Sequence, residues 1–132
     1  MLVGSRMKKN PVTVTPDQLL SLAKAKMAAG GFRRLPVVSD DKLVGILTER
    51  DLRQHIGYWD KTKIDGVMTE KPITVTPGTT LEDAAQLMLK HKIGGLPVMA
   101  DGRLVGIITE TDFLRAFVAL QKAPRRAAPK RR

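Results

Sequence analysis

The chain of 132 residues contains no cysteine, two histidines and few aromatic residues. Without cysteine it has no disulfide, no thiol nucleophile and no Cys-ligated zinc or iron–sulfur site. His55 and His91 are too few for a histidine-rich metal centre, and an aromatic content of 4% is too low for a base-stacking nucleic-acid platform. No apolar run approaches the roughly 20 residues that cross a bilayer, so we expect no membrane association. The lack of cysteine also fits a reducing cytoplasm, where we expect the protein.

Positive charge is in excess, but it is unevenly distributed. Lys and Arg number 23 against 13 Asp and Glu, which gives a formal net charge of +10. Six of these excess charges lie in the last eleven residues, KAPRRAAPKRR. This stretch has no apolar periodicity, so we expect residues 121–132 to form a basic disordered tail. Such a tail can contact nucleic acid through counterion release, although a solubilising tail without a dedicated partner is the simpler interpretation.

The most informative feature is an internal repeat. Residues 7–53 and 68–114 align without a gap at an offset of 61, with 20 identities in 47 positions. The similarity is concentrated in MKKNPVTVTP against MTEKPITVTP and in RRLPVVSDDKLVGILTERDL against GGLPVMADGRLVGIITETDF. This similarity indicates a duplication. We divide the chain into a first repeat at 7–53, a connector at 54–67, a second repeat with a C-terminal helix at 68–120, and the tail.

Each repeat begins with a predicted strand and helix. The β-branched segments 12–14 and 73–75 are typical of strands. Residues 15–18, Thr-Pro-Asp-Gln, resemble a capping box with proline at the first helical position, and residues 80–83 are the analogous start in the second repeat. The glycines at 30–31 predict the end of the first helix.

A predicted β-hairpin and a second helix complete each repeat. Short apolar runs flank a turn at 39–42 and another at 100–103, and both are typical of hairpins. The second helix begins at Thr48 or Thr109, with acidic residues in its first turn. Each unit is therefore β-α-β-β-α, and a unit of this size has too little core to be stable alone. We expect an α+β fold in which the two repeats pack with pseudo-two-fold symmetry.

These motifs resemble a pair of CBS domains, which together form a Bateman module. The resemblance rests on Pro-Val/Ile-Thr-Val near each start, Leu-Pro-Val after the first helix, and Gly-Ile-Leu/Ile-Thr-Glu-x-Asp near each end. The chain is similar to stand-alone bacterial CBS pairs of the acetoin-utilisation type. The resemblance implies a regulatory adenine-nucleotide sensor rather than an enzyme. It implies no required cofactor, and AMP, ADP, ATP, S-adenosylmethionine or a dinucleotide as the regulatory ligand.

The Gly-x-x-Thr-x-x-Asp segment has its own physical logic. Glycine in a strand permits close backbone approach, and Thr48 or Thr109 then stands at a helix N-terminus, where anions bind. The family assigns Asp51 and Asp112 to the ribose hydroxyls. The alternative interpretation is that threonine and aspartate only cap a helix.

The family pattern places a ligand in each of two clefts between the repeats. For the cleft of Asp112 it implies adenine contacts and local side chains from Val12, Phe32, Ile107, Thr109 and Thr111, with phosphate contacts from Arg33 and Arg50. For the cleft of Asp51 it implies Ile46, Thr48 and Arg50, with Ile73 and Ile93 beside the base. Because Arg33 aligns with Gly94 and Arg50 with Thr111, the two sites are not equivalent. We expect the Asp112 cleft to be the better nucleotide site.

Other functions stay open beside the regulatory one. A ligand-free dimerisation scaffold and a nucleic-acid-binding adaptor that uses the basic tail are the alternatives. A homodimer is expected in any case, because CBS pairs commonly form two-fold dimers. The last helix supports this independently, since it is apolar on two sides, with Phe113, Phe117 and Leu120 in one stripe and Leu114 and Val118 in another.

Overall fold

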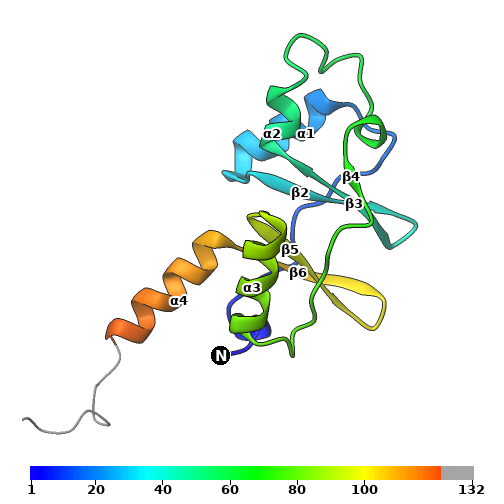
Figure 1. Cartoon of the computed structure of the whole chain (residues 1–132). Coiled ribbons are helices and arrows are strands. Elements are labelled where there is room, and N and C mark those ends of the chain that lie inside the picture. Colours follow the sequence, from blue (N-terminus) through cyan, green and yellow to red (C-terminus); the bar gives the residue numbers. More distant parts are fainter. Residues whose placement is uncertain (123–132) are drawn as a thin grey trace, which may run out of the picture.

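The computed structural model describes residues 1–122 as a mixed α+β fold (Figure 1). The elements in chain order are η1 (Val3–Ser5), β1 (Lys8–Lys9), α1 (Leu20–Gly30), β2 (Arg34–Ser39), β3 (Lys42–Thr48), α2 (Glu49–Arg53), η2 (Ile64–Gly66), β4 (Thr69–Glu70), α3 (Leu81–His91), β5 (Gly95–Ala100), β6 (Arg103–Thr109) and α4 (Glu110–Lys122). The helix α4 reaches two residues into the predicted tail, and the rest of that tail, at 123–132, lies outside the described residues.

The predicted hairpins are confirmed. β2 pairs with β3, and β5 pairs with β6 in the equivalent antiparallel register. Both two-residue turns have positive φ at both positions, 50° and 62° at Asp40–Asp41 and 52° and 75° at Asp101–Gly102, as a tight hairpin turn requires. Gly31, with φ 69°, ends α1 as predicted.

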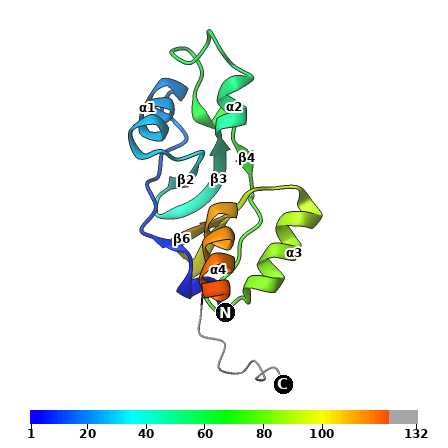
Figure 2. The same cartoon turned by 90° about the vertical axis from the view of Figure 1, so that its left-hand side faces the viewer.

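The short strand that opens each repeat joins the hairpin of the other repeat. β4 pairs with β3, with Thr69 opposite Ile46, and β1 pairs with β6, with Lys8 opposite Ile107. The two sheets therefore have the strand orders β2-β3-β4 and β1-β6-β5. In Figures 1 and 2 the first repeat, with α1 and α2, lies above the second. Neither sheet is complete without a strand from the other repeat.

Gly45 and Gly106 lie where the exchanged strands cross. A Cβ atom on Gly45 would lie 2.9 Å from the carbonyl oxygen of Thr69, and one on Gly106 would lie 2.8 Å from the carbonyl oxygen of Lys8. A side chain at either position would therefore push the exchanged strand away. The close backbone approach expected at these glycines is made by the chain itself.

The segments 12–14 and 73–75 are not regular strands, and the prediction of strands there was wrong. Each contributes only one isolated parallel bridge, Val14 to Val37 and Val75 to Val98. The next residue that could donate to such a ladder is a proline in both repeats, at positions 16 and 77. Because proline has no N–H, the ladder stops after one bridge.

The first helices of the two repeats begin differently. The predicted capping box at 15–18 was wrong as a helix start, because α1 begins at Leu20 and has no side-chain cap. Its first N–H donates instead to the carbonyl oxygen of Thr62, in the connector, at 2.9 Å. The predicted start of α3 is confirmed, since Thr80 Oγ1 accepts a hydrogen bond from the Asp83 N–H at 3.0 Å.

The structural repeat is longer than the stretch of sequence identity. The short 3-10 helices η1 and η2 occupy equivalent places before β1 and β4. Val3 and Ile64, at matching positions in these helices, are both fully buried. Ile64 packs in the core of the first repeat and Val3 in the core of the second. Part of the connector at 54–67 therefore belongs to a hydrophobic core.

Truncating Ile64 tests this role of the connector. Ile64→Ala should lower the free energy of unfolding by about 2–5 kcal/mol, because it opens a cavity in a core. Leu2→Ala is the matched control in the equivalent segment, where the side chain is 47% exposed, and it should cost less than about 1 kcal/mol. Urea unfolding measures both. Equal costs would contradict the packing of Ile64 in the first core.

Candidate functional site

A cavity of about 670 Å³ lies between the two repeats, beside the N-terminus of α2. Small-molecule sites typically have volumes of roughly 300–1,000 Å³. The cavity brings together the six residues predicted for one cleft, namely Ile46, Thr48, Arg50 and Asp51 from the first repeat and Ile73 and Ile93 from the second. We call this cavity the Asp51 cleft.

Asp51 caps α2 with one carboxylate oxygen, Oδ2, and leaves the other, Oδ1, available. Its Oδ2 accepts a hydrogen bond from the Thr48 N–H at 2.9 Å, while its own N–H donates to Thr48 Oγ1 at 3.3 Å. The capping interpretation is therefore confirmed for this pair. Within residues 1–122, no hydrogen bond or ion pair engages Oδ1 of Asp51. That oxygen can accept a hydrogen bond from a ligand hydroxyl.

Cationic side chains dominate the lining of the Asp51 cleft. Six cations, Arg33, Arg34, Arg50, Arg53, Lys71 and Lys92, face only two carboxylates, those of Glu49 and Asp51. Arg53 is paired with Glu49 at 2.7 Å. Among the described residues the other five cations form no ion pair. The cleft is thus suited to a ligand that carries several negative charges.

Arg34 reaches from the first repeat across the glycines of the second. A Cβ atom on Gly94 would lie 2.6 Å from Arg34 Nη2 and 2.8 Å from Glu110 Oε1, and one on Gly95 would lie 2.7 Å from Arg34 Cδ. Burial lowers the pKa of Arg34, the Glu110 carboxylate opposes that shift, and neighbouring Arg33 adds to it. Arg34 remains a cation, because an arginine is effectively always protonated. Glycines at 94 and 95 make the room that its side chain occupies.

The opposite cleft is much smaller. A cavity of about 170 Å³ there is lined by Val12, Phe32 and Ile107, three of the residues predicted for the Asp112 cleft. The other predicted residues do not join them: Arg33 and Arg50 line the Asp51 cleft, and Thr109, Thr111 and Asp112 do not line this cavity. The geometry of the two clefts therefore does not support the prediction that the Asp112 cleft is the better nucleotide site.

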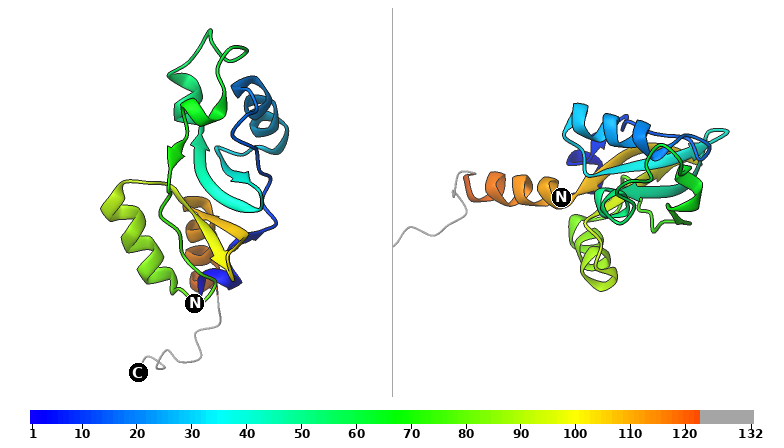
Figure 3. Two further views of the ribbon diagram at one scale, coloured as in Figure 1. Left: turned by 90° about the vertical axis from the view of Figure 1, so that its right-hand side faces the viewer. Right: turned by 90° about the horizontal axis from the view of Figure 1, so that it is seen from above.

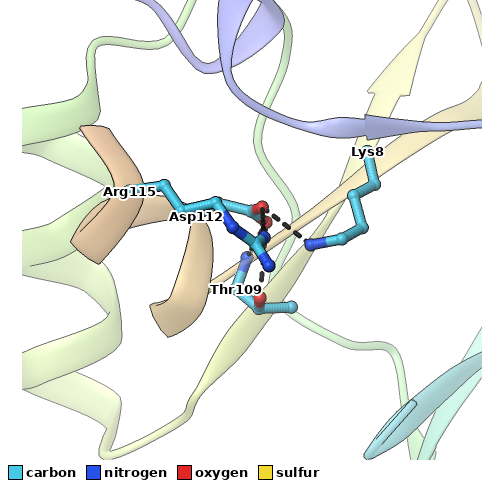
Figure 4. A network of polar contacts seen from close by, with 4 residues as sticks. All are labelled: Lys8, Thr109, Asp112 and Arg115. Carbon is cyan, nitrogen blue, oxygen red and sulfur yellow. Dashed lines mark hydrogen bonds and ion pairs between the residues drawn. The ribbon is translucent and has the colours of Figure 1, made fainter. Parts of the chain in front are cut away.

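Asp112 is buried and bound from several directions, as Figure 4 shows. Its side chain is 4% exposed, and its Oδ1 lies 2.8 Å from Lys8 Nζ and 3.6 Å from Arg115 Nη1. Its Oδ2 accepts hydrogen bonds from the Thr109 N–H at 2.9 Å and from Thr109 Oγ1 at 3.3 Å. Both carboxylate oxygens are therefore occupied by groups of the protein.

Sequence reasoning missed six cations that line these clefts, namely Lys8, Lys9, Arg34, Arg53, Lys71 and Lys92. In the repeat alignment they stand opposite Thr69, Glu70, Gly95, Leu114, Asn10 and Gly31. Each is a position where one repeat carries a positive charge and the other does not. That comparison of the repeats was the signal available in the sequence.

Residues 1–122 contain no group of three or more His, Asp or Glu side chains that could hold a metal ion. None of the helices in that part of the chain is long and apolar enough to cross a membrane.

Comparisons with solved structures match this architecture. The chain is similar to the CBS domain pair of protein MJ0100 in complex with 5′-methylthioadenosine and S-adenosyl-L-methionine, with 31% identity, a TM-score of 0.84, and coverage of 91% of this chain and 98% of that one. It is similar to CBSX2 in complex with AMP, with 32% identity, a TM-score of 0.80 and coverage of 92% and 98%. It is also similar to AcuB from Vibrio cholerae, with 34% identity, a TM-score of 0.84 and coverage of 98% of both chains.

Sequence comparisons point the same way. Inosine-5′-monophosphate dehydrogenase from Staphylococcus haemolyticus is 42% identical over 107 residues, which cover 78% of this chain but 22% of that enzyme. The chain thus spans about a fifth of the length of the curated relatives it matches, and the match lies in their CBS part. A family model for the CBS domain matches residues 3–58 and again residues 64–119. The chain therefore belongs to the CBS domain family and carries two CBS domains.

Proposed function

We propose that this CBS pair is a regulatory module that binds a phosphate-bearing adenine nucleotide in the Asp51 cleft. The observation that carries the proposal concerns one cavity between the repeats. An available Asp51 oxygen meets there five cations that form no ion pair within residues 1–122. Complexes of similar CBS proteins with AMP, 5′-methylthioadenosine and S-adenosyl-L-methionine support the adenosyl part of the ligand.

Each part of the nucleotide has a complementary group in the cleft. The ribose hydroxyls donate hydrogen bonds to Oδ1 of Asp51, which lies in the first turn of α2. The apolar side chains of Ile46, Ile73 and Ile93 can pack against the adenine ring. The phosphates meet the five cations, for which charge-assisted hydrogen bonds are the strongest contacts available. Regulatory binding needs no further group, and we assign no catalytic step to the chain.

The charge of the lining favours phosphates over a thioether or sulfonium ligand. 5′-Methylthioadenosine carries no phosphate, and S-adenosylmethionine carries a positive sulfonium centre that the arginines would repel. A triphosphate offers the most negative charge, so ATP should bind more tightly than AMP, and both more tightly than 5′-methylthioadenosine.

Binding should also change the relation between the repeats. Arg33, Arg34 and Arg50 come from the first repeat, whereas Lys71, directly after β4, and Lys92, directly after α3, come from the second. A phosphate group that engages both sets links the two repeats. The ligand then favours the arrangement in which both sets reach it, and this differential affinity is the regulatory signal.

Replacing Asp51 tests the proposed site. Asp51→Ala removes charge-assisted hydrogen bonds worth about 1.5–3 kcal/mol, so ATP affinity should fall roughly 10- to 150-fold. Isothermal titration calorimetry of the wild type and the variant with ATP, AMP and 5′-methylthioadenosine measures this effect and the ligand order.

Asp83→Ala is the matched control for that titration. Asp83 occupies the same position in the first turn of a threonine-capped helix, α3, but is exposed and does not line the cleft. Its removal should leave ATP affinity unchanged. An unchanged affinity in Asp51→Ala would show that Asp51 is only a helix cap.

We also propose that two copies of the chain associate through their helices. The helix α4 projects from the body of the molecule (Figures 1 and 3). Its apolar side chains Leu114, Phe117, Val118 and Leu120 are between 47% and 65% exposed. A groove of about 660 Å³ between α3 and α4, lined by Met88, Leu89 and Phe113 among others, continues this surface. A surface of this kind is typical of a protein–protein interface.

A charge placed on α4 tests the dimer. Phe117→Glu should convert a two-chain species into a one-chain species, because it buries a carboxylate in an apolar interface. Gln121→Glu is the control, since it adds the same charge on the same helix near its end. Sedimentation equilibrium over a wide concentration range measures the mass. A one-chain mass for the wild type at every concentration would overturn the proposal.

A further inference from the structure

We infer that Lys8 is an internal ligand of Asp112 that keeps the second cleft closed, so that each chain takes up a single nucleotide in the Asp51 cleft. The inference rests on the proposed function for the class of ligand. It adds the stoichiometry and names the residue that sets it.

The contrast between the two aspartates is the first observation. Asp112 is 4% exposed, with Lys8 Nζ 2.8 Å from Oδ1 and Thr109 donating twice to Oδ2. Asp51 receives the equivalent bond from the Thr48 N–H, but no cation contacts its Oδ1 among the described residues. The ammonium of Lys8 therefore stands where, in the other cleft, a ligand hydroxyl would stand.

The strand exchange explains how a single position makes this difference. Lys8 lies on β1, opposite Ile107 of β6, and its equivalent on β4 is Thr69, opposite Ile46 of β3. Both side chains thus start from matching places in their sheets. The lysine is long enough to reach the aspartate that follows the hairpin. Within residues 1–122, no hydrogen bond joins Thr69 to Asp51.

The size of the two cavities agrees with a closed second cleft. Lys8 lines the cavity of about 170 Å³, whereas the Asp51 cleft measures about 670 Å³. A ribose can reach Asp112 only after the Lys8 ammonium has left it. The apparent affinity of that cleft for a nucleotide is its intrinsic affinity multiplied by the fraction of time during which Lys8 is displaced.

Exchanging the two residues tests the inference. In titrations with ATP, the wild type should bind one nucleotide per chain and Lys8→Thr should bind two. Asp51→Ala should lose tight binding, and Lys8→Thr combined with Asp51→Ala should regain one site. Thr69→Lys, which leaves Asp112 and its partners untouched, should close the Asp51 cleft and abolish binding. Lys9→Thr removes the same charge from the same strand, does not contact Asp112, and should keep one site.

Each outcome separates this inference from the proposed function. Two sites in the wild type, no site in the folded double variant, or unchanged ATP affinity in folded Thr69→Lys would overturn the role of Lys8. Should Lys8→Thr fail to fold, as circular dichroism would show, the Thr69→Lys titration decides alone. A wild type that binds no ATP would refute the proposed function, and a site gained by Lys8→Thr in that case would still support the role of Lys8.

Discussion

The exchange of short strands between the two hairpins is the constraint on which the rest of the structure depends. Each hairpin is completed by backbone hydrogen bonds from the strand that opens the other repeat. Gly45 and Gly106 provide the space for that crossing. The residues that follow each exchanged strand are placed beside the hairpin of the other repeat. Both clefts are therefore lined by residues from both repeats. A ligand in either cleft must therefore contact elements that come from far apart in the sequence.

The two clefts share a backbone design but differ in charge. The alignment of the repeats places Arg33 and Arg34 opposite Gly94 and Gly95. The paired glycines leave room for Arg34 to cross to the second repeat, where it lines the Asp51 cleft and also the smaller cavity. Lys8, opposite Thr69, is also a cation that only one repeat carries, but it has the opposite effect. Its ammonium binds Asp112 and occupies the second cleft. The duplication has thus produced one open cleft lined by cations and one in which Lys8 binds the aspartate.

Features set by neighbouring residues could be predicted from the sequence. The hairpins, the glycine end of α1 and the caps at Thr48 and Thr80 follow from local turn and capping chemistry, and the structure contains them. The six residues expected around Asp51 line one cavity, because the repeat and the family pattern specify their places. The start of α1 could not be predicted, since its first N–H is satisfied by Thr62, far along the chain. The contact of Lys8 with Asp112 joins residues 104 apart and depends on the strand exchange, which no local pattern encodes.

The most direct test of the account is nuclear magnetic resonance mapping of amide shifts in the labelled chain on addition of ATP. The account predicts that the perturbed amides cluster at Thr48–Asp51, Lys71–Ile73 and Lys92–Gly95, around the Asp51 cleft. Amides at Asn10–Val12, Phe32 and Ile107, around the smaller cavity, should respond much less. Perturbations centred on that second set, with the first set unchanged, would contradict the account.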